Sequence, residues 1–405
     1  MPNTAQQLNL RHLLVALETA RTGAISKAAQ RVHLSQSAVT QALSRLEKAL
    51  EVALFDRTST GAMPTAAGRI LIHRIERGEA WLRMIEQVVT ERGERAPRRL
   101  ARLLSSTQLR ALIAVVQSEH YSRAAQRLGL SQPSLHRAVR DLEAICGRQF
   151  FQRAPQGVLP SWHARQVARY ANLFFSEINQ GLVELKEHHG LMTGSITIGA
   201  LPLSRVSLVP NAVNQILIKH PKTQVKIIDG SYEEQLSGLL HGQIDVIVGA
   251  LRQPAPSADI VQERLFSDPL CIVVRTNHPL LRQGHISTAA LRELSWIAPR
   301  ENTPAREVFG HFFVDQGSAP PRDIIECSSL VATRALLMGS DRAALLTARQ
   351  VDIEVTRNLL AISSIELEGT ARDIGITLRK QWQPTKVQSE FLTMLRGAAE
   401  TASEQ

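Results

Sequence analysis

Two short stretches of the sequence carry amide, hydroxyl, imidazole and guanidinium groups at helical spacing. In the first stretch these groups belong to Gln36, Ser37, Thr40, Gln41, Ser44 and Arg45. In the second they belong to Gln132, Ser134, His136, Arg137 and Arg140. Side chains of these types can hydrogen-bond to base edges and phosphates when a helix lies in the major groove of DNA. Each stretch directly follows a serine, Ser35 or Ser131, that can cap the helix and join this DNA-facing set.

The two stretches belong to an internal repeat with an offset of 96 residues. Residues 26–47 and 122–143 are identical at 11 of 22 aligned positions. The same register continues through three further identical pairs: Phe55 and Phe151, Gly61 and Gly157, and Pro64 and Pro160. Unrelated helices do not share caps, small residues and a turn in one register over such a span. The sequence therefore predicts a duplicated domain.

Each copy predicts a helix-turn-helix followed by a wing. Paired alanines at 28–29 and 124–125 would let a second helix approach the third closely. Leu34 and Leu130 are expected to fill the core at the turn. A short apolar strand, a glycine turn and another apolar segment then predict the wing. The remaining basic side chains that we expect at DNA are Lys27, Arg57 and Arg153.

Positive charge is concentrated in the half that contains the repeat. The 405-residue chain has a formal net charge of +10. Residues 1–192 hold 26 Lys and Arg against 15 Asp and Glu, whereas the remaining residues hold 21 against 22. This division predicts a polyanion-binding part and a separate part with another task. A merely soluble basic surface would have the same charge, so the repeat carries more weight than the charge.

The first copy resembles the winged helix-turn-helix of LysR-type regulators, whose signature AAxxLxxSQ…LTxAG fits residues 28–68 almost throughout. The second copy keeps Ser131-Gln132-Pro133 but has Ser161-Trp162-His163-Ala164 in place of the TxAG turn. Since that family normally has one such module, the second module is a departure from it. The resemblance implies double-stranded DNA as a partner, assembly into a homo-oligomer, and RNA polymerase as a further partner.

Each copy is followed by an expected helix with an apolar seam. The first seam consists of Leu71, Ile75, Gly78, Leu82, Ile85 and Val89, and the second of Val167, Ala171, Phe174, Ile178, either Gly181 or Leu182, and Leu185. Such seams require a partner helix. In the LysR type the equivalent helix pairs two subunits. Here the two seams could pair with each other or with those of another chain, and both arrangements remain open. Residues 94–99 are expected to form an exposed connector.

The C-terminal half alternates strand-like and helix-like runs, which predicts an α/β fold with mainly parallel strands. The strand-like runs are residues 196–200, 224–228, 244–249, 269–275, 296–298, 323–327, 343–346, 364–368 and 374–379. Residues 194–210, 241–251 and 263–280 resemble the effector domain of LysR-type regulators. That resemblance implies two α/β lobes, as in periplasmic binding proteins, with a ligand cleft between them.

The expected fold is thus α/β with an all-α N-terminal part. Its boundaries are winged helix-turn-helix domains at 8–68 and 104–164, linker helices at 69–92 and 165–189, and an effector-binding domain at 194–399. By analogy, lobe I comprises residues 194–268 and 369–399, and lobe II comprises residues 269–368.

Side chains after the expected strands form a candidate effector site, because ligands bind at the carboxyl ends of parallel strands. These residues are Leu203, Ser204, Arg205, Ser231, Arg300, Thr303 and Ser329. Hydroxyls and free N–H groups at helix starts suit an anion. We therefore expect a small carboxylate or a sugar-like effector. For each residue taken singly, ordinary helix capping is the alternative.

Other classes of protein lack support in the sequence. No GxSxG, GxxxxGK[ST], HExxH or strand-linked GxGxxG motif occurs, so we expect no enzyme and no cofactor. The three cysteines are far apart, and no metal site is predicted. Without an apolar leader or a run of ~20 apolar residues, we expect a cytoplasmic protein with no membrane partner. A ligand-responsive transcription regulator is the favoured prediction. The alternative is a metabolite-binding protein whose helical half mediates assembly.

Overall fold

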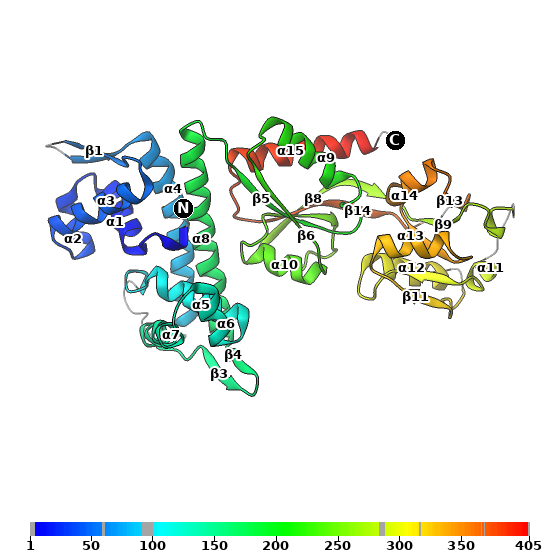
Figure 1. Cartoon of the computed structure of the whole chain (residues 1–405), viewed down its shortest axis with the longest axis horizontal. Coiled ribbons are helices and arrows are strands. Elements are labelled where there is room, and N and C mark those ends of the chain that lie inside the picture. Colours follow the sequence, from blue (N-terminus) through cyan, green and yellow to red (C-terminus); the bar gives the residue numbers. More distant parts are fainter. Residues whose placement is uncertain are drawn as a thin grey trace. The chain divides into compact units, whose positions relative to one another are not determined.

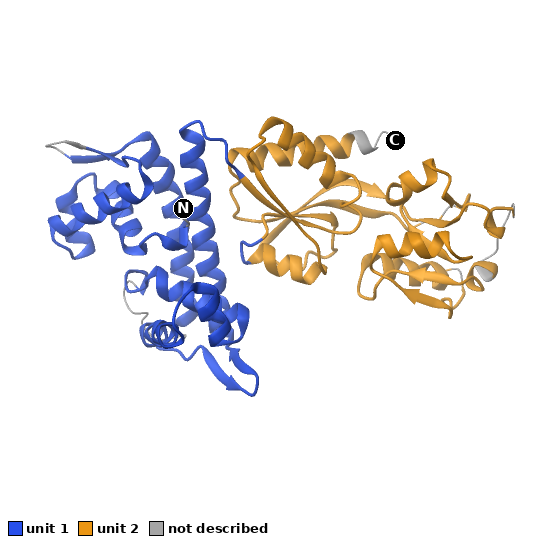
Figure 2. Cartoon of the chain, in the orientation of Figure 1, with its two compact units in different colours: residues 1–194, 241–243 blue, residues 195–240, 244–405 orange. Residues whose placement is uncertain are grey.

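The computed structural model describes residues 5–58, 61–90, 100–282, 288–315, 317–365, 367 and 369–403. The chain divides into two compact units, which Figure 2 colours separately. One unit comprises residues 1–194 with 241–243, and the other comprises residues 195–240 with 244–405. The first unit is mainly helical and holds two small hairpins, whereas the second holds two five-stranded sheets.

The first unit contains two copies of one arrangement of three helices and a hairpin (Figure 1). Module 1 consists of α1 (Leu10–Thr22), α2 (Ile25–Val32), α3 (Gln36–Leu50), β1 (Phe55–Thr58) and β2 (Gly61–Pro64). Module 2 consists of α5 (Ser106–Ser118), α6 (Tyr121–Leu128), α7 (Gln132–Cys146), β3 (Phe151–Ala154) and β4 (Gly157–Pro160). Every element of module 2 begins and ends 96 residues after its counterpart, so the predicted duplication is confirmed.

A glycine anchors each wing to the end of the first helix of its module. A Cβ atom on Gly61 would lie 2.6 Å from the carbonyl oxygen of Gly23, and one on Gly157 would lie 2.3 Å from that of Glu119. The following residue donates its N–H to the same carbonyl, as Ala62 does to Gly23 at 2.9 Å. Only glycine allows this close approach of two backbones, which explains why both copies contain it.

The expected role of Leu34 and Leu130 in the core is wrong. Their side chains are 46% and 38% exposed. Each follows a residue in the left-handed conformation that ends the second helix, and the N–H of Leu34 bonds to the carbonyl of Ala29 at 3.0 Å. This helix-ending geometry leaves the leucine on the surface, while buried Val39 fills the core behind it.

The long helices α4 (Ala66–Val89) and α8 (Trp162–His188) follow the modules and pack against each other within the chain. They run in opposite directions, because Arg74 contacts Glu177 whereas Trp81 contacts Tyr170. Of the two arrangements that the sequence left open, the structure has the seams paired within one polypeptide. We call this α4–α8 interface the linker seam. The expected connector at residues 94–99 lies outside the described residues.

The start of α8 forms without the glycine of the TxAG turn. At Gly68 in α4, a Cβ atom would lie only 2.0 Å from the carbonyl oxygen of Leu54. Its counterpart Ala164 is nevertheless fully buried, and the Ser161 hydroxyl caps the helix by accepting the N–H of Ala164 at 3.2 Å. The departure from the family signature therefore leaves the junction intact.

The first sheet of the second unit has the strand order β6-β5-β7-β14-β8. Its strands are β5 (Ser195–Ala200), β6 (Gln224–Ile228), β7 (Val246–Ala250), β8 (Ile260–Asp268) and β14 (Arg372–Arg379). The helices that accompany it are α9 (Leu208–Lys219), α10 (Tyr232–Leu240) and α15 (Lys386–Ser403).

The second sheet has the order β11-β10-β12-β9-β13. Its strands are β9 (Cys271–Arg275), β10 (Trp296–Ala298), β11 (Ile324–Glu326), β12 (Ala343–Leu346) and β13 (Leu360–Ile362). Its helices are α11 (Thr288–Arg292), α12 (Pro304–Asp315), α13 (Leu330–Met338) and α14 (Ala348–Thr356).

Both sheets are mixed rather than mainly parallel, which corrects the expectation from sequence. β5 pairs in parallel with β6 and β7, but β14 is antiparallel to β7 and β8. The second sheet repeats this pattern, with β9 antiparallel to β12 and β13. The chain crosses between sheets from β8 to β9 and returns from β13 to β14. The strands next to these crossings pair antiparallel, β8 with β14 and β9 with β13.

The strand prediction has two further errors. It misses β8, because Gln262, Glu263 and Arg264 interrupt the apolar pattern of that strand. The run predicted at 364–368 contains no strand in its described residues, and β13 lies just before it.

Candidate DNA-reading surface and effector pocket

Helix α3 of module 1 exposes the polar face predicted for it. Its buried face comprises Val39, Ala42, Leu43 and Leu46. On the other side Gln36, Ser37, Gln41, Ser44 and Arg45 are exposed, Thr40 is half-buried, and Lys27 is exposed on α2. The Ser35 hydroxyl accepts the N–H of Ala38 at 3.1 Å, and the Thr40 hydroxyl donates to the Gln36 carbonyl at 2.9 Å. Both hydroxyls therefore already have hydrogen-bond partners in the backbone of this helix.

Helix α7 of module 2 presents the corresponding face. Ser131 caps it by accepting the N–H of Ser134 at 3.2 Å. Ser131, Gln132, Ser134, Arg137 and Arg140 are all exposed, and His136 is half-buried.

The His136 ring stacks on Tyr121 of α6, with ring centroids 3.7 Å apart and an angle of 14° between the planes. Burial, together with the positive charges of Arg140 and Arg153, lowers the pKa of His136 below its ordinary value. Near pH 7 the imidazole is therefore mainly neutral and offers both a donor and an acceptor.

The two wing arginines occupy equivalent strand positions. Arg57 lies on β1, where only its backbone is among the described atoms, and Arg153 lies on β3 with an exposed side chain.

The two recognition faces differ in charge at equivalent positions. Gln41, Ser44 and Arg45 of α3 correspond to Arg137, Arg140 and Asp141 of α7. The second face thus carries two arginines where the first has neutral groups, and one carboxylate where the first has an arginine. The structure places both faces at the surface of the same unit, with different chemistry on each.

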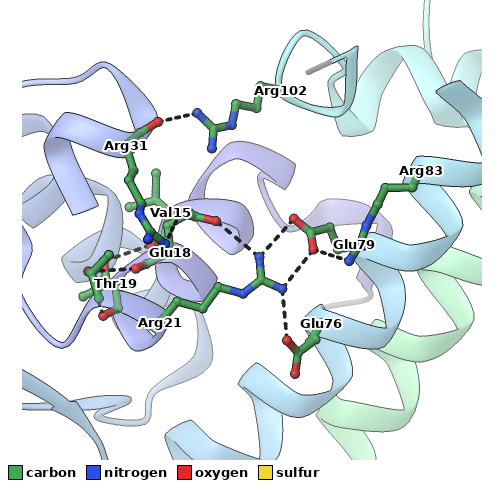
Figure 3. A network of polar contacts seen from close by, with 10 residues as sticks. Val15, Glu18, Thr19, Arg21, Arg31, Glu76, Glu79, Arg83 and Arg102 are labelled. Atoms are coloured by element: carbon green, nitrogen blue, oxygen red, sulfur yellow. Dashed lines mark hydrogen bonds and ion pairs between the residues drawn. The ribbon is translucent and has the colours of Figure 1, made fainter. Parts of the chain in front are cut away.

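An ion-pair network fastens module 1 to its linker helix (Figure 3). Arg21, in the last turn of α1, donates to Glu76 and Glu79 of α4, each at 3.0 Å. Glu79 also accepts from Arg83 at 2.8 Å. Burial alone would raise the pKa of Glu79, but the hydrogen bonds and charge of Arg21, with Arg83, hold it below its ordinary value.

Among the described residues, module 2 has no such network at the equivalent place. The counterpart of Arg21 is Gln117, and the counterparts of Glu76 and Glu79 are Asn172 and Phe175. Phe175 is 2% exposed, so this attachment is apolar.

A cavity of about 1160 Å³ lies within the second unit and is lined by residues from the strands, helices and loops of both sheets. Six of the seven predicted effector residues line it: Leu203, Arg205, Ser231, Arg300, Thr303 and Ser329. Ser204 does not line the cavity. It is fully buried, and its hydroxyl bonds to the carbonyls of Leu201 at 2.9 Å and Val248 at 2.8 Å.

The hydroxyls in the cavity wall also cap helices. Ser231 accepts the N–H of Glu234 at 3.2 Å, and Ser329 accepts that of Ala332 at 3.3 Å. Thr303, just before α12, accepts the N–H of Arg306 at 3.3 Å and donates to the Arg300 carbonyl at 2.7 Å. Each of these hydroxyls therefore caps a helix and also lines the cavity.

The sequence analysis missed three arginines that line the same cavity. One of them, Arg334, pairs with Glu354 at 3.2 Å. The other two are Arg252 and Arg372. Burial lowers the pKa of both guanidinium groups, and the charge of Arg252 lowers that of Arg372 further, against the opposing effect of Asp268. The Arg252 guanidinium lies 4.3 Å from the centre of the Tyr232 ring. The Arg372 Nε atom is buried without a hydrogen-bond partner among the described residues. Two like charges, both partly withdrawn from water, favour an anion beside them.

The strand-end rule could have found Arg252, which follows β7 by two residues. Arg372 begins β14 and reaches the cavity only because Ile374 pairs with Ala250 in an antiparallel register. No signal in the sequence fixed that pairing.

The described residues contain neither a membrane-spanning helix nor a metal-binding cluster. None of their helices combines the length and apolar character needed to cross a bilayer. Likewise, no group of three or more His, Cys, Asp or Glu side chains among them is arranged to hold a metal ion.

Comparison with protein families gives three matches. Residues 189–400 match the LysR substrate binding domain. Residues 10–69 and 106–165 each match the bacterial regulatory helix-turn-helix protein, lysR family.

Two relatives align with this chain over different shares of its length. The HTH-type transcriptional regulator GalR of Pseudomonas putida is 29% identical over 372 residues, covering 92% of each chain. The HTH-type transcriptional regulator PcaQ of Agrobacterium fabrum is 28% identical over 291 residues, covering 72% of this chain and 94% of that protein.

Solved structures show the same fold. Full-length OxyR from Pseudomonas aeruginosa aligns with a TM-score of 0.55 and 20% identity, covering 73% of this chain and 94% of that one. Full-length CbnR complexed with its target DNA aligns with a TM-score of 0.51 and 21% identity, covering 72% and 98%.

Proposed function

The chain belongs to the LysR family of DNA-binding transcriptional regulators with an effector-binding domain, and from this premise we propose that it reads two different half-sites with one polypeptide and responds to a small carboxylate. The observation that carries the first part is the pair of unlike recognition faces within one unit. The observation that carries the second part is the pair of arginines in the cavity of the other unit.

For DNA, the proposed contacts come from both recognition helices. The base-reading side chains are Gln36, Thr40, Gln41, Ser44 and Arg45 in α3, and Gln132, His136, Arg137 and Arg140 in α7. The proposed phosphate contacts are Lys27, Ser35, Ser37, Arg57, Ser131, Ser134 and Arg153. Because the two faces differ, the two half-sites differ in sequence.

A hydroxyl-radical footprint on the DNA upstream of the protein's own gene tests this proposal. The protein should protect two half-sites. Replacing His136, Arg137 and Arg140 by alanine should remove protection of one half-site, and the matched Thr40, Gln41 and Ser44 triple alanine variant should remove the other. If the first variant protects both half-sites unchanged, module 2 does not read bases. Absence of all protection at low salt would contradict the DNA-reading proposal for this DNA.

Salt dependence separates DNA binding from the alternative that the helical half serves only assembly. Six or more phosphate contacts should reduce the affinity by a factor on the order of a thousand between about 50 and 200 mM salt. A purely assembling half would bind no DNA at either salt concentration.

For the effector, we propose a small carboxylate held by Arg252 and Arg372. A carboxylate accepts two guanidinium donors at once, whereas a sugar-like ligand brings no charge to these two partly buried guanidinium groups. Leu203, Arg205, Ser231, Arg300, Thr303 and Ser329 would surround the rest of the ligand. Differential affinity for two arrangements of the lobes would then shift the regulator between states.

Calorimetric titration with succinate, citrate and glucose tests the charge of the ligand. A carboxylate should bind and glucose should not. Arg252→Gln and Arg372→Gln should each weaken carboxylate binding about tenfold or more, in line with the loss of a charged hydrogen bond. The control Arg264→Gln removes an arginine that pairs with Asp373 and does not line the cavity, so it should leave binding unchanged. Binding of glucose alone would contradict the carboxylate assignment.

The partners of the regulator follow from the same proposal. It would act in the cytoplasm as a homo-oligomer and contact RNA polymerase when bound to DNA. Following DNA bending while adding the bound carboxylate would show whether the effector changes the complex.

A further inference from the structure

The linker seam has an approximate two-fold symmetry that the repeat makes visible. Residue n of α4 corresponds to residue n + 96 of α8, so contacts across the seam occur in related pairs. Gly78 and Phe174 are counterparts of each other, and they also touch. A Cβ atom on Gly78 would lie 2.9 Å from Phe174 Cδ2. The axis of this approximate symmetry therefore passes where the phenylalanine ring enters the space left by the glycine.

The two sides of this axis have unlike chemistry. On one side Arg74 donates to Glu177 at 3.0 Å and Gln180 at 2.7 Å, and it also pairs with Glu184. On the other side lie Tyr170, the counterpart of Arg74, and Trp81, the counterpart of Glu177. Their rings stack with centroids 6.0 Å apart. A charged contact in one half of the seam thus corresponds to an aromatic contact in the other half.

A second glycine, Gly181, leaves space for the side chain of Arg74 on the charged side of the seam. A Cβ atom on Gly181 would lie 3.0 Å from the Cβ atom of Arg74. The counterpart of Gly181 is Ile85, which is fully buried. Arg74 itself is only 2% exposed, and Glu177 and Gln180 are each 6% exposed. The ion pair is therefore buried, and each charge depends on the other helix for its partner.

Self-pairing of either helix would lose these matches. An α4–α4 pair would set Gly78 against a second Gly78 and would bury Arg74 without the carboxylates of α8. An α8–α8 pair would set Phe174 against a second Phe174 and would bury Glu177 without an arginine. An interface between identical partners must be self-complementary, and a buried charge without a partner is strongly unfavourable.

We propose that α4 and α8 are a matched pair that accepts each other and rejects self-pairing. Contacts of the α4–α4 or α8–α8 type between two copies of this chain are then excluded. This inference concerns which helices pair, and it does not depend on which DNA or effector the protein binds.

Hydrogen exchange of the α4 and α8 backbone amides in the full chain measures the pairing directly. Gly78→Phe places two aromatic rings at the axis, and Phe174→Gly leaves a hole there. Each should speed exchange in the middle of both helices by about tenfold or more, because unpaired helices open locally. The double variant Gly78→Phe/Phe174→Gly places the ring on α4 and the glycine on α8. Its amide exchange rates should return to within about threefold of those of the natural protein. A double variant that exchanges faster than either single variant would overturn the proposal.

A variant that gives α8 the seam residues of α4 tests the rejection of self-pairing. It combines Tyr170→Arg, Phe174→Gly, Glu177→Trp and Gly181→Ile. We expect the same loss of protection, about tenfold or more, because Arg74 would meet no carboxylate at position 177. Unchanged protection would show that α4 accepts an α4-like partner and would overturn the proposal.

Two controls keep the result interpretable. Ala80→Phe adds the same ring to an exposed position of α4 and should leave exchange unchanged. Amides of β5 and β7 in the second unit should keep their protection in every variant, which shows that the chain still folds.

Discussion

Modules 1 and 2 have the same arrangement of helices and wing, but they differ at several positions that face the linker helix or the surface. Both have the serine cap, the paired alanines and the wing glycine at equivalent places. Module 1 is fastened to α4 by the Arg21 network, whereas the equivalent attachment of module 2 is apolar. The recognition faces also differ in charge. The positions that fold the module are alike in both copies, whereas several positions on the recognition face and at the attachment to the linker helix differ.

The largest effect is expected where the two sides of the linker seam differ. Arg74→Met removes the cation from the buried cluster and leaves Glu177 with only the half-buried Arg77, which pairs with it at 2.8 Å. We expect the free energy of unfolding of the helical unit to fall by about 3–5 kcal/mol. Tyr170→Leu, at the equivalent place on the aromatic side, should cost only about 1 kcal/mol. Urea unfolding followed by circular dichroism measures both, and equal losses would remove the proposed difference between the two sides.

The next effect concerns the half-site that each module is proposed to read. His136→Thr, Arg137→Gln and Arg140→Ser give α7 the residues that α3 has at equivalent positions. The second half-site should come to resemble the first, with preferences changing by about 1–3 kcal/mol per base pair contacted. Selection from a random DNA library measures the preferred sequence. The reverse exchange, Thr40→His with Gln41→Arg and Ser44→Arg, is the matched control and should convert the first half-site. An unchanged preference in both variants would show that these positions do not determine the half-site.

The smallest effect concerns the attachment of module 1. Arg21→Gln gives it the residue found in module 2 and should lower stability by roughly 1 kcal/mol, because this network is partly exposed. Since the pKa of Glu79 is held below its ordinary value, this contribution is present above the ordinary glutamate pKa of about 4.3. It is lost as the pH falls through the lower, folded-state pKa.

Denaturation at several pH values tests that dependence. The natural protein and the Arg21→Gln variant should differ at pH 7 and converge in acid. Gln117→Ala in module 2 should show no comparable dependence on pH. A difference between Arg21→Gln and the natural protein that persists below the folded-state pKa of Glu79 would contradict the proposed role of this ion pair.

The repeat made the helical half predictable from sequence, because caps, alanines and a glycine turn act over a few residues. The same local signals placed most of the expected effector residues in the wall of one cavity. Ser204 differs because its hydroxyl bonds inward to two carbonyls, a choice that spacing alone does not reveal.

Features that depend on distant partners were not predictable. Arg372 reaches the cavity through the antiparallel pairing of β14 with β7. β8 carries polar side chains in mid-strand and lacks the expected alternation. The pairing of α4 with α8 also depends on residues 96 positions apart, such as Gly78 and Phe174, and no local pattern in the sequence reveals that these two residues are in contact.

The pairing of α4 with α8 in one polypeptide changes how the regulator behaves at low copy number. A recognition unit assembled from two separate subunits dissociates on dilution, and its concentration falls as the square of the chain concentration. Joining the halves covalently keeps the local concentration of one module near the other on the order of millimolar, however few molecules the cell contains. A single chain emerging from a single ribosome therefore carries both recognition helices, and occupancy of a paired site should rise in simple proportion to the number of chains made.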